Sequence, residues 1–148
     1  MQTAEMLRVD SASAHVLDRV AEGVFDSPVC PESRRAFVDD ARHELVVAIE
    51  SDAVIAFVSA VRYVHPDKPD QLWINEVSTA PAHRRRGHAR RLVAFMLEVA
   101  HTLGCREAWL ATDGDNEAAR ALYRALNLEE PDPIVMHSRR LVAPDQND

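Results

Sequence analysis

The segment from Leu72 to Leu92 (LWINEVSTAPAHRRRGHARRL) constrains the fold of this chain more than any other. Its first part, residues 72–79, is rich in strand-forming residues, and Pro81 ends that run. A run of arginines and a single glycine, Gly87, come next. Apolar residues then recur at the spacing of a helix. The segment therefore predicts a strand, a tight basic turn and the start of an amphipathic helix.

This order of elements suits the binding of a phosphorylated ligand. The first amides of a helix have no partner inside the helix and carry partial positive charge, so a diphosphate fits there. Gly87 lets the backbone approach the phosphates without a Cβ in the way. Arg84, Arg85 and Arg86 add full positive charges around the same turn. An arginine-rich, solvated helix start, such as one that binds nucleic acid, is the alternative interpretation.

The pattern Arg84-x-x-Gly87-x-Ala89 resembles the acyl-CoA signature of the GNAT superfamily of N-acetyltransferases. The expected order of elements, β-α-α-β-β-β-α-β-α-β, resembles the GNAT fold over nearly the whole chain. The resemblance implies an α/β (α+β) fold with a mixed, mostly antiparallel central sheet flanked by helices. It also implies acetyl-CoA as acyl donor, with CoA as product. The pantetheine arm would lie where strands 72–79 and 107–112 splay apart.

Turn signals and hydrophobic periodicity predict the other elements. Ser51-Asp52 indicates a hairpin between strands over 45–50 and 54–63. Gly104 and Asn127 indicate the left-handed ends of two helices. The remaining expectations are a strand over 6–9, a helix capped by Ser11 or Ser13 and carrying Val16, Leu17, Val20 and Val24, a loop over 25–33, a short helix through Ala36 and Phe37, a helix over 117–126 and a final strand over 134–141. In a fold of this kind, the loop and the short helix would form one wall of the acceptor cleft.

Length and composition bound the class of protein. At 148 residues we expect one domain, 1–148, with flexible tails at about 1–5 and 143–148. The net charge of -7 argues against a general nucleic-acid binder. Cys30 and Cys105 suggest neither a disulfide scaffold nor a metal site. The sequence shows no signal region and no membrane-spanning run, so we expect a soluble, cytoplasmic protein. An exposed final strand could pair in a homodimer.

Transfer of an acetyl group from a thioester to an amine needs a base, a donor to the thioester oxygen and an acid for the thiolate. By resemblance, Glu76 is the general base, directly or through one water. Anchoring a cationic substrate by charge is its alternative role. Strand alternation would place Glu76 on one face with Ile74 and Ser78. Tyr123, in AARALYRALN, resembles the GNAT tyrosine that points at the cofactor sulfur, and a core aromatic is its alternative role.

The resemblance also assigns residues to the cofactor. Asn116 resembles the GNAT asparagine that hydrogen-bonds the pantetheine arm, and capping of the following helix is a compatible role. The backbone amide of Val77 would polarise the thioester carbonyl. We call the basic turn at 84–87 the cofactor turn, and we expect His83 and His88 on its surface. The implied cofactor-binding residues are Val77, Thr79, Arg84, Arg85, Arg86, Gly87, His88, Ala89, Asn116 and Tyr123.

The run from Glu76 to Gly87, with His-Arg-Arg-x-Gly at 83–87, resembles that of aminoglycoside 3-N-acetyltransferases, and so does Val135-Met136-His137. This resemblance implies an aminoglycoside acceptor and an antibiotic-resistance enzyme. Aminoglycosides are polycations, so carboxylates around a cleft suit them. A peptide or protein amine as acceptor, or a noncatalytic acyl-CoA sensor, are the alternatives. The expected substrate-binding residues are Glu76, Asp113, Asp115, Glu129 and His137, although a solvated acidic surface accounts for part of this charge.

Overall fold

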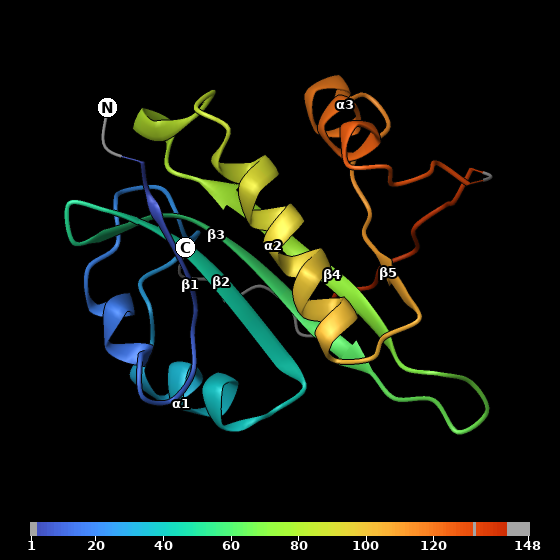
Figure 1. The fold of residues 1–148 in the computed structure, drawn as a ribbon, viewed down its shortest axis with the longest axis horizontal. Helices are drawn as coiled ribbons and strands as arrows, with labels where there is room; N and C mark the ends of the chain where they lie inside the picture. Colours follow the sequence, from blue (N-terminus) through green and yellow to red (C-terminus); the bar gives the residue numbers. More distant parts are fainter. Residues whose placement is uncertain (1–2, 132, 142–148) are drawn as a thin grey trace.

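The computed structural model describes residues 3–131 and 133–141 of the chain. Across these residues a single sheet is packed between helical segments (Figure 1). The elements are β1 (Glu5–Arg8), η1 (Ala14–Asp18), α1 (Pro31–Asp39), β2 (His43–Glu50), β3 (Ala53–Tyr63), β4 (Gln71–Thr79), η2 (Pro81–His83), α2 (His88–Thr102), β5 (Glu107–Trp109) and α3 (Glu117–Ala125).

The strands of the sheet lie in the order β1-β2-β3-β4-β5, so each strand pairs with the next one along the chain. Every neighbouring pair is antiparallel except β4 and β5, which are parallel. A parallel pair needs a crossover connection, and α2 provides it across one face of the sheet (Figure 1). The predicted mixed, mostly antiparallel sheet is confirmed.

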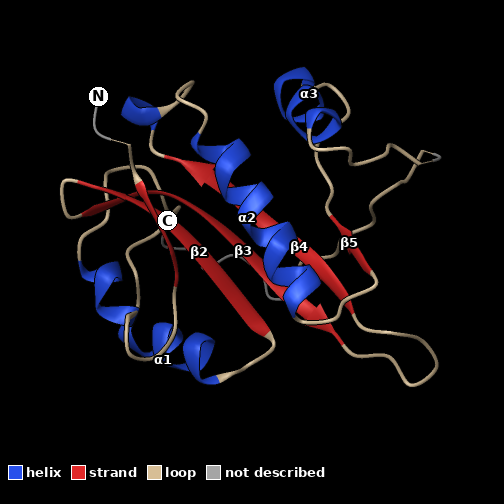
Figure 2. Cartoon of the chain, viewed as in Figure 1, coloured by secondary structure: helices blue, strands red, loops and turns tan. Residues whose placement is uncertain are grey.

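The ladder between β4 and β5 is short. It joins residues 71–73 to residues 107–109, and β4 then continues to Thr79 without β5 beside it. Figure 2 shows the chain beyond β5 leading away from β4 toward α3. The predicted splay between these two strands is confirmed, whereas β5 is shorter than the predicted strand over 107–112.

The hairpin between β2 and β3 turns at Ser51 and Asp52. Both residues have left-handed backbones, with φ of 51° and 61°. A two-residue turn with both φ angles positive matches the right-handed twist of the strands that it joins. The predicted hairpin is therefore confirmed. It brings the end of β2, Glu50, to the same end of the sheet as the segment that follows β4.

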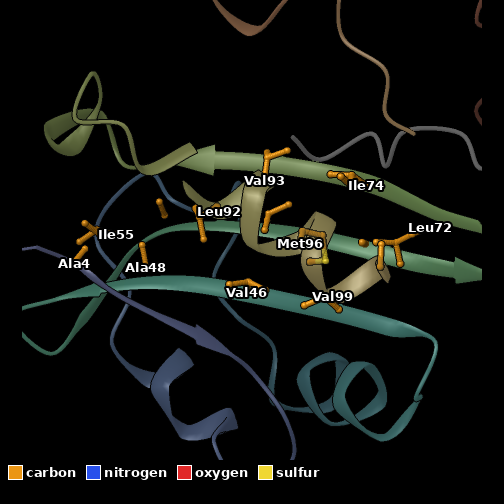
Figure 3. Packing of buried hydrophobic residues seen from close by; sticks show 14 residues of the cluster. Ala4, Val46, Ala48, Ile55, Leu72, Ile74, Leu92, Val93, Met96 and Val99 are labelled. Carbon is orange, nitrogen blue, oxygen red and sulfur yellow. The ribbon is translucent and has the colours of Figure 1, made fainter. Parts of the chain in front are cut away.

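Helix α2 covers one face of the sheet through an apolar stripe. Leu92, Val93 and Met96 are fully buried, and Figure 3 shows them in the layer between α2 and the sheet, with Val46 and Ile74. The helix is bounded by two left-handed glycines, at positions 87 and 104, with φ of 81° and 75°. The amides of residues 104 and 105 return to carbonyls of the last helical turn, as in a helix that ends on glycine.

The opposite face of the sheet is covered by the segment 14–39. Phe25 stacks on Phe57 of β3 with ring centroids 4.3 Å apart, and Val24 is buried beside them. The predicted helix as far as Val24 is wrong, because only η1 is helical and the chain then pairs with β3, Ala21 N donating to the carbonyl of residue 54 at 2.9 Å. Helix α1 starts at Pro31, inside the predicted loop, since proline at a first helical position loses no hydrogen bond.

Neither predicted serine cap forms at η1. Ser13 precedes η1, but its side chain makes no capping bond and instead hydrogen-bonds Asp10 at 2.8 Å. Helix α3 does begin with a side-chain cap, in which Asn116 Oδ1 accepts from Ala119 N at 3.1 Å. Asn127, with φ of 61°, ends that helix as predicted.

The end of the described chain does not join the sheet. Residues 133–141 form no strand, so the predicted final strand over 134–141 is wrong. Its apolar side chains are exposed, Ile134 to 82% and Val135 to 76%. Residues with high strand propensity form a strand only where the edge of another strand is there to pair with them. The predicted tail from Ala143 lies outside the described residues, as do positions 1–2. Among the helices in the described part of the chain, none is long and apolar enough to span a membrane.

Replacement of Leu92 by alanine should lower the free energy of unfolding by about 2–5 kcal/mol, because it opens a cavity in the buried layer under α2. Urea unfolding followed by circular dichroism measures this change. Leu141→Ala is the matched control: it removes the same atoms from a side chain that is 89% exposed, and should change the free energy by less than about 0.5 kcal/mol. A comparable loss in both variants would show that residues 133–141 pack against the sheet in solution.

Candidate active site

The basic turn before α2 has an unusual backbone. Arg85 and Gly87 both have positive φ, 61° and 81°, and Gly87 is the N-cap of α2. A Cβ at position 87 would meet no atom within 4 Å, so the space beside the turn is open. Arg84 donates from Nε to the carbonyl of Thr79 at 3.2 Å, and the Arg84 and Arg85 residues are exposed. The turn therefore presents a helix N-terminus and two exposed cationic residues to a ligand.

Arg86 is placed differently from the two arginines before it. Its guanidinium donates to both carboxylate oxygens of Glu50, at 2.6 and 3.1 Å. His83 Nδ1 lies 3.1 Å from the same carboxylate. The hydrogen bonds from Arg86 hold the pKa of Glu50 below its ordinary value. We call this group, Glu50 with His83 and Arg86, the turn clasp, because it fastens the turn to the end of the β2–β3 hairpin.

His88 is not the surface residue that the sequence suggested. Its side chain belongs to the same stripe of α2 as Leu92 and Met96, one and two helical turns further on, and the residue is only 5% exposed. Neither ring nitrogen has a hydrogen-bond partner among the described residues. Burial, and then the charge of Arg86, lower the pKa of His88. The four-residue spacing to Leu92 was the sequence signal that could have predicted this burial.

Glu76 faces away from α2 because of a bulge in β4. Glu76 pairs with Ser59 and Ile74 pairs with Ala60, so Asn75 is an extra residue with no partner on β3. Ile74 and Val77 both pack into the core under α2. Glu76 shares its face with Ser78, as predicted, but not with Ile74, and that part of the prediction is wrong.

A second carboxylate, on Asp26, stands near Glu76. Ser78 Oγ donates to the carbonyl of Val24 at 2.7 Å, which holds the loop before α1 against β4. Burial, and then the negative charge of Asp26, raise the pKa of Glu76. Sequence reasoning missed Asp26, although the loop that carries it was expected to form a wall of the acceptor cleft. The sequence shows that residue 26 is acidic, but no local pattern indicates that it lies near residue 76.

Asp26 also lines a cavity in the segment that covers this face of the sheet. The cavity has a volume of about 480 Å³ and lies between η1 and the start of α1. Phe25 and Val29 supply apolar walls, and Asp18 and Arg34 lie at its lining as an ion pair. Space for a ligand therefore adjoins the loop that holds Asp26.

The two predicted cofactor residues at α3 occupy different positions on that helix. Asn116 caps the helix through Oδ1, which leaves its amide group as a donor. Tyr123 is half-buried and packs against the core under α2. Burial raises the pKa of its hydroxyl, so this group stays protonated at neutral pH. The structure is thus compatible with both the capping and core roles and leaves the cofactor roles as predictions.

The other predicted site residues divide between the strand, the helix and exposed loops. Thr79 ends β4, and Ala89 lies half-buried in the first turn of α2. Besides Glu76, four residues were predicted to bind the substrate. All four are exposed: Asp113, Asp115, Glu129 and His137. Asp113, Asp115 and Glu129 lie on the segments that flank α3, and His137 lies on the segment 133–141, so none of the four shares β4 with Glu76.

A model of the acetyltransferase (GNAT) family matches residues 14–127 of the chain. The chain belongs to this family. Aminoglycoside N(6')-acetyltransferase type 1 of Salmonella typhimurium is 24% identical over 98 residues, which cover 64% of this chain and 68% of that protein. The aminoglycoside relatives are thus N(6')-acetyltransferases, and the comparisons do not single out the predicted 3-N class.

Solved GNAT structures share the fold at low sequence identity. An aminoglycoside acetyltransferase from an uncultured soil metagenomic sample, in complex with sisomicin, superposes with a TM-score of 0.81 at 14% identity, covering 95% of this chain and 97% of that one. AAC(6')-Iy, in complex with a bisubstrate analogue of CoA and an acetylneamine, superposes with a TM-score of 0.73 at 18% identity, covering 94% and 99%.

GNAT acetyltransferases use acetyl-CoA as acetyl donor. In this GNAT protein, the open turn at Gly87 and the N-terminus of α2 would hold the diphosphate, and Arg84 and Arg85 would lie beside it as cations. The pantetheine arm would lie where β4 continues without β5 beside it. Arg86 is paired with Glu50 in the turn clasp, and its role beside the cofactor stays a prediction.

Glu50→Gln should loosen the cofactor turn. An exposed ion pair contributes little, so we expect trypsin to cleave after Arg84 to Arg86 roughly two- to fivefold faster in the native protein. Mass spectrometry of the fragments over time measures the rate at each site. Glu22→Gln, which changes an exposed carboxylate on another loop, should leave the rate unchanged. Unchanged cleavage in Glu50→Gln would mean that the clasp does not hold the turn.

His88→Leu should reduce the loss of stability on acidification. The folded-state pKa of His88 is lowered, so its contribution is full above the unfolded value of about 6.5 and declines as the pH falls through the folded pKa. Urea midpoints at pH 7.5 and pH 5 should therefore differ less in His88→Leu than in the unmodified protein. His101→Leu, at an exposed position of the same helix, should keep the original difference. Equal pH dependence in all three proteins would contradict burial of a neutral His88.

Proposed function

We propose that this GNAT protein transfers an acetyl group from acetyl-CoA directly to a primary amine, within a ternary complex and in a single acetyltransferase domain. The observation that carries the proposal is the position of Glu76. The bulge at Asn75 points its carboxylate away from α2, just beyond the point where β4 and β5 part. The cofactor turn follows β4 directly, so the acetyl donor and the carboxylate would meet along one continuous segment.

The roles of the side chains follow from the chemistry of aminolysis. Glu76 would take a proton from the substrate ammonium, and its raised pKa makes it a stronger base than an ordinary carboxylate. The neutral nitrogen forms a bond to the thioester carbon while the carbon–sulfur bond breaks. The amide of Val77 would donate to the carbonyl oxygen, and Tyr123 would protonate the thiolate. The ammonium loses two protons: one reaches water through Glu76, and the other replaces the proton that Tyr123 gives to the CoA thiolate.

An aminoglycoside is the acceptor that we favour. Both the Salmonella relative and the neighbour solved with sisomicin are aminoglycoside acetyltransferases by name. The paired carboxylates of Asp26 and Glu76 would suit a substrate with several ammonium groups. The sequence run at 76–87 favours acetylation at position 3, whereas that relative is an N(6')-acetyltransferase, so the position has to be read from the product.

Acetyl-CoA turnover across a panel of acceptors tests the proposal. Thiol release should be saturable with sisomicin or gentamicin, and NMR of the product would locate the new amide. Release with peptides alone would move the function to peptide or protein acetylation. Tight binding of CoA with no release on any amine would overturn the proposal in favour of an acyl-CoA sensor.

Glu76→Gln should lower kcat by roughly 10²- to 10⁴-fold, because the amine then lacks its base. The dissociation constant of CoA should stay within about twofold, since the Glu76 carboxylate faces away from α2, whose N-terminus would hold the diphosphate, and a tenfold change would need 1.4 kcal/mol. Steady-state kinetics and calorimetry measure the two quantities. Glu22→Gln is the matched control and should keep both values. A parallel loss of CoA binding and turnover would rule out the assignment of Glu76 as the base.

A further inference from the structure

The two tryptophans of the chain form one stack. Trp73 of β4 and Trp109 of β5 are direct partners in the last pair of the parallel ladder. Their ring centroids are 4.8 Å apart and their planes differ by 10°. Trp109 is 37% exposed, so the stack ends in an aromatic surface that solvent reaches. Neither ring belongs to the buried clusters on the two faces of the sheet.

Strand register places this stack beside Glu76. Trp73 pairs with Val61 and Glu76 pairs with Ser59, and these two partners are alternate residues of β3. Alternate residues of a strand point to the same face. The bulge at Asn75 therefore puts Trp73 and Glu76 side by side on the face opposite α2, with Trp109 next to Trp73. Because the pair is the last of its ladder, the stack lies where the two strands begin to separate.

Two carboxylates lie on the Glu76 side of the stack. Glu76 is adjacent along β4, and Asp26 approaches Glu76 from the loop before α1, held there by the bond from Ser78 to Val24. An aromatic face attracts cations through its quadrupole, and more strongly where carboxylates flank it. Aromatic surface also binds the apolar face of a rigid ring at low cost in conformational entropy, whereas a flexible chain must be ordered to lie on it.

We propose that the Trp73–Trp109 stack is the platform on which the acceptor binds, and that its ligand is a saturated ring bearing ammonium groups, as in an amino sugar. This inference rests on the proposed acetyltransfer and assigns the residues that bind the ring of its acceptor. The ring packs on the indoles, one ammonium faces Glu76 for reaction, and a second faces Asp26. Open-chain polyamines and lysine side chains offer the charges without the ring face, so they are poorer acceptors.

Variants of Trp109 separate packing from charge. Trp109→Leu should raise KM for sisomicin roughly five- to tenfold, since aromatic packing and cation–π contacts of this size are lost. KM for spermidine, an open-chain polyamine, and KM for acetyl-CoA should each change less than about twofold. Trp109→Phe, which keeps an aromatic face, should recover most of the sisomicin affinity. An equal rise for sisomicin and spermidine, or none for either, would overturn the platform.

Tryptophan fluorescence provides a second test that does not depend on turnover or on the folding of a variant. Because both tryptophans are in the stack, the emission of the unmodified protein reports on this place alone. With CoA present, titration with sisomicin should give a saturable change, and spermidine at equal concentration should not. An unchanged or identical signal for the two would overturn the inference. Failure of the proposed function is a separate result: thiol release on no amine, whatever the fluorescence shows.

Discussion

The bulge at Asn75 is the constraint on which the site depends. In a regular strand, Glu76 would follow Ile74 onto the face packed under α2, where Val93 and Met96 are fully buried. A carboxylate in that layer would be desolvated without a partner, which is costly. The extra residue lets β4 send both Ile74 and Val77 into the core while it turns Glu76 outward. The stability of the core and the position of the carboxylate thus require the same irregularity.

The cofactor turn is fixed to the same sheet by a different interaction. Gly87 and Arg85 need left-handed backbones, which are strained for arginine, so the turn needs support from outside itself. The turn clasp supplies it, because Glu50 stands at the end of β2, where the hairpin turns. The paired strands β2, β3 and β4 therefore hold both Glu76 and the turn in place. A rigid frame of this kind holds two reacting partners at a constant separation, which is what transfer between them requires.

Much of the fold could be predicted from the sequence because its signals are local. The hairpin at Ser51-Asp52, the glycines that bound α2 and the helix end at Asn127 each depend on the backbone of one or two residues. The spacing of apolar residues also predicts the buried stripe of α2, and one helical turn before Leu92 the same stripe includes His88. The error at His88 arose from its neighbours, since three arginines before it suggested a wholly solvated turn.

What the sequence could not predict depends on partners far along the chain. Nothing in the residues around Asn75 marks a bulge, because the bulge is a relation between β4 and β3. Asp26 reaches Glu76 only through the fold, by way of the bond between Ser78 and Val24.

The apolar run at 134–141 shows the converse error. Its residues favour a strand, yet in the described chain no ladder receives them, and their side chains stay exposed. Local strand propensity indicates where strands can form, but pairing with a neighbouring strand determines which of them form and which way their side chains face. In this GNAT protein the clearest case is β4. The strand has β3 along one edge and leaves β5 after the tryptophan pair, so the residues beyond Trp73 pair with β3 but not with β5.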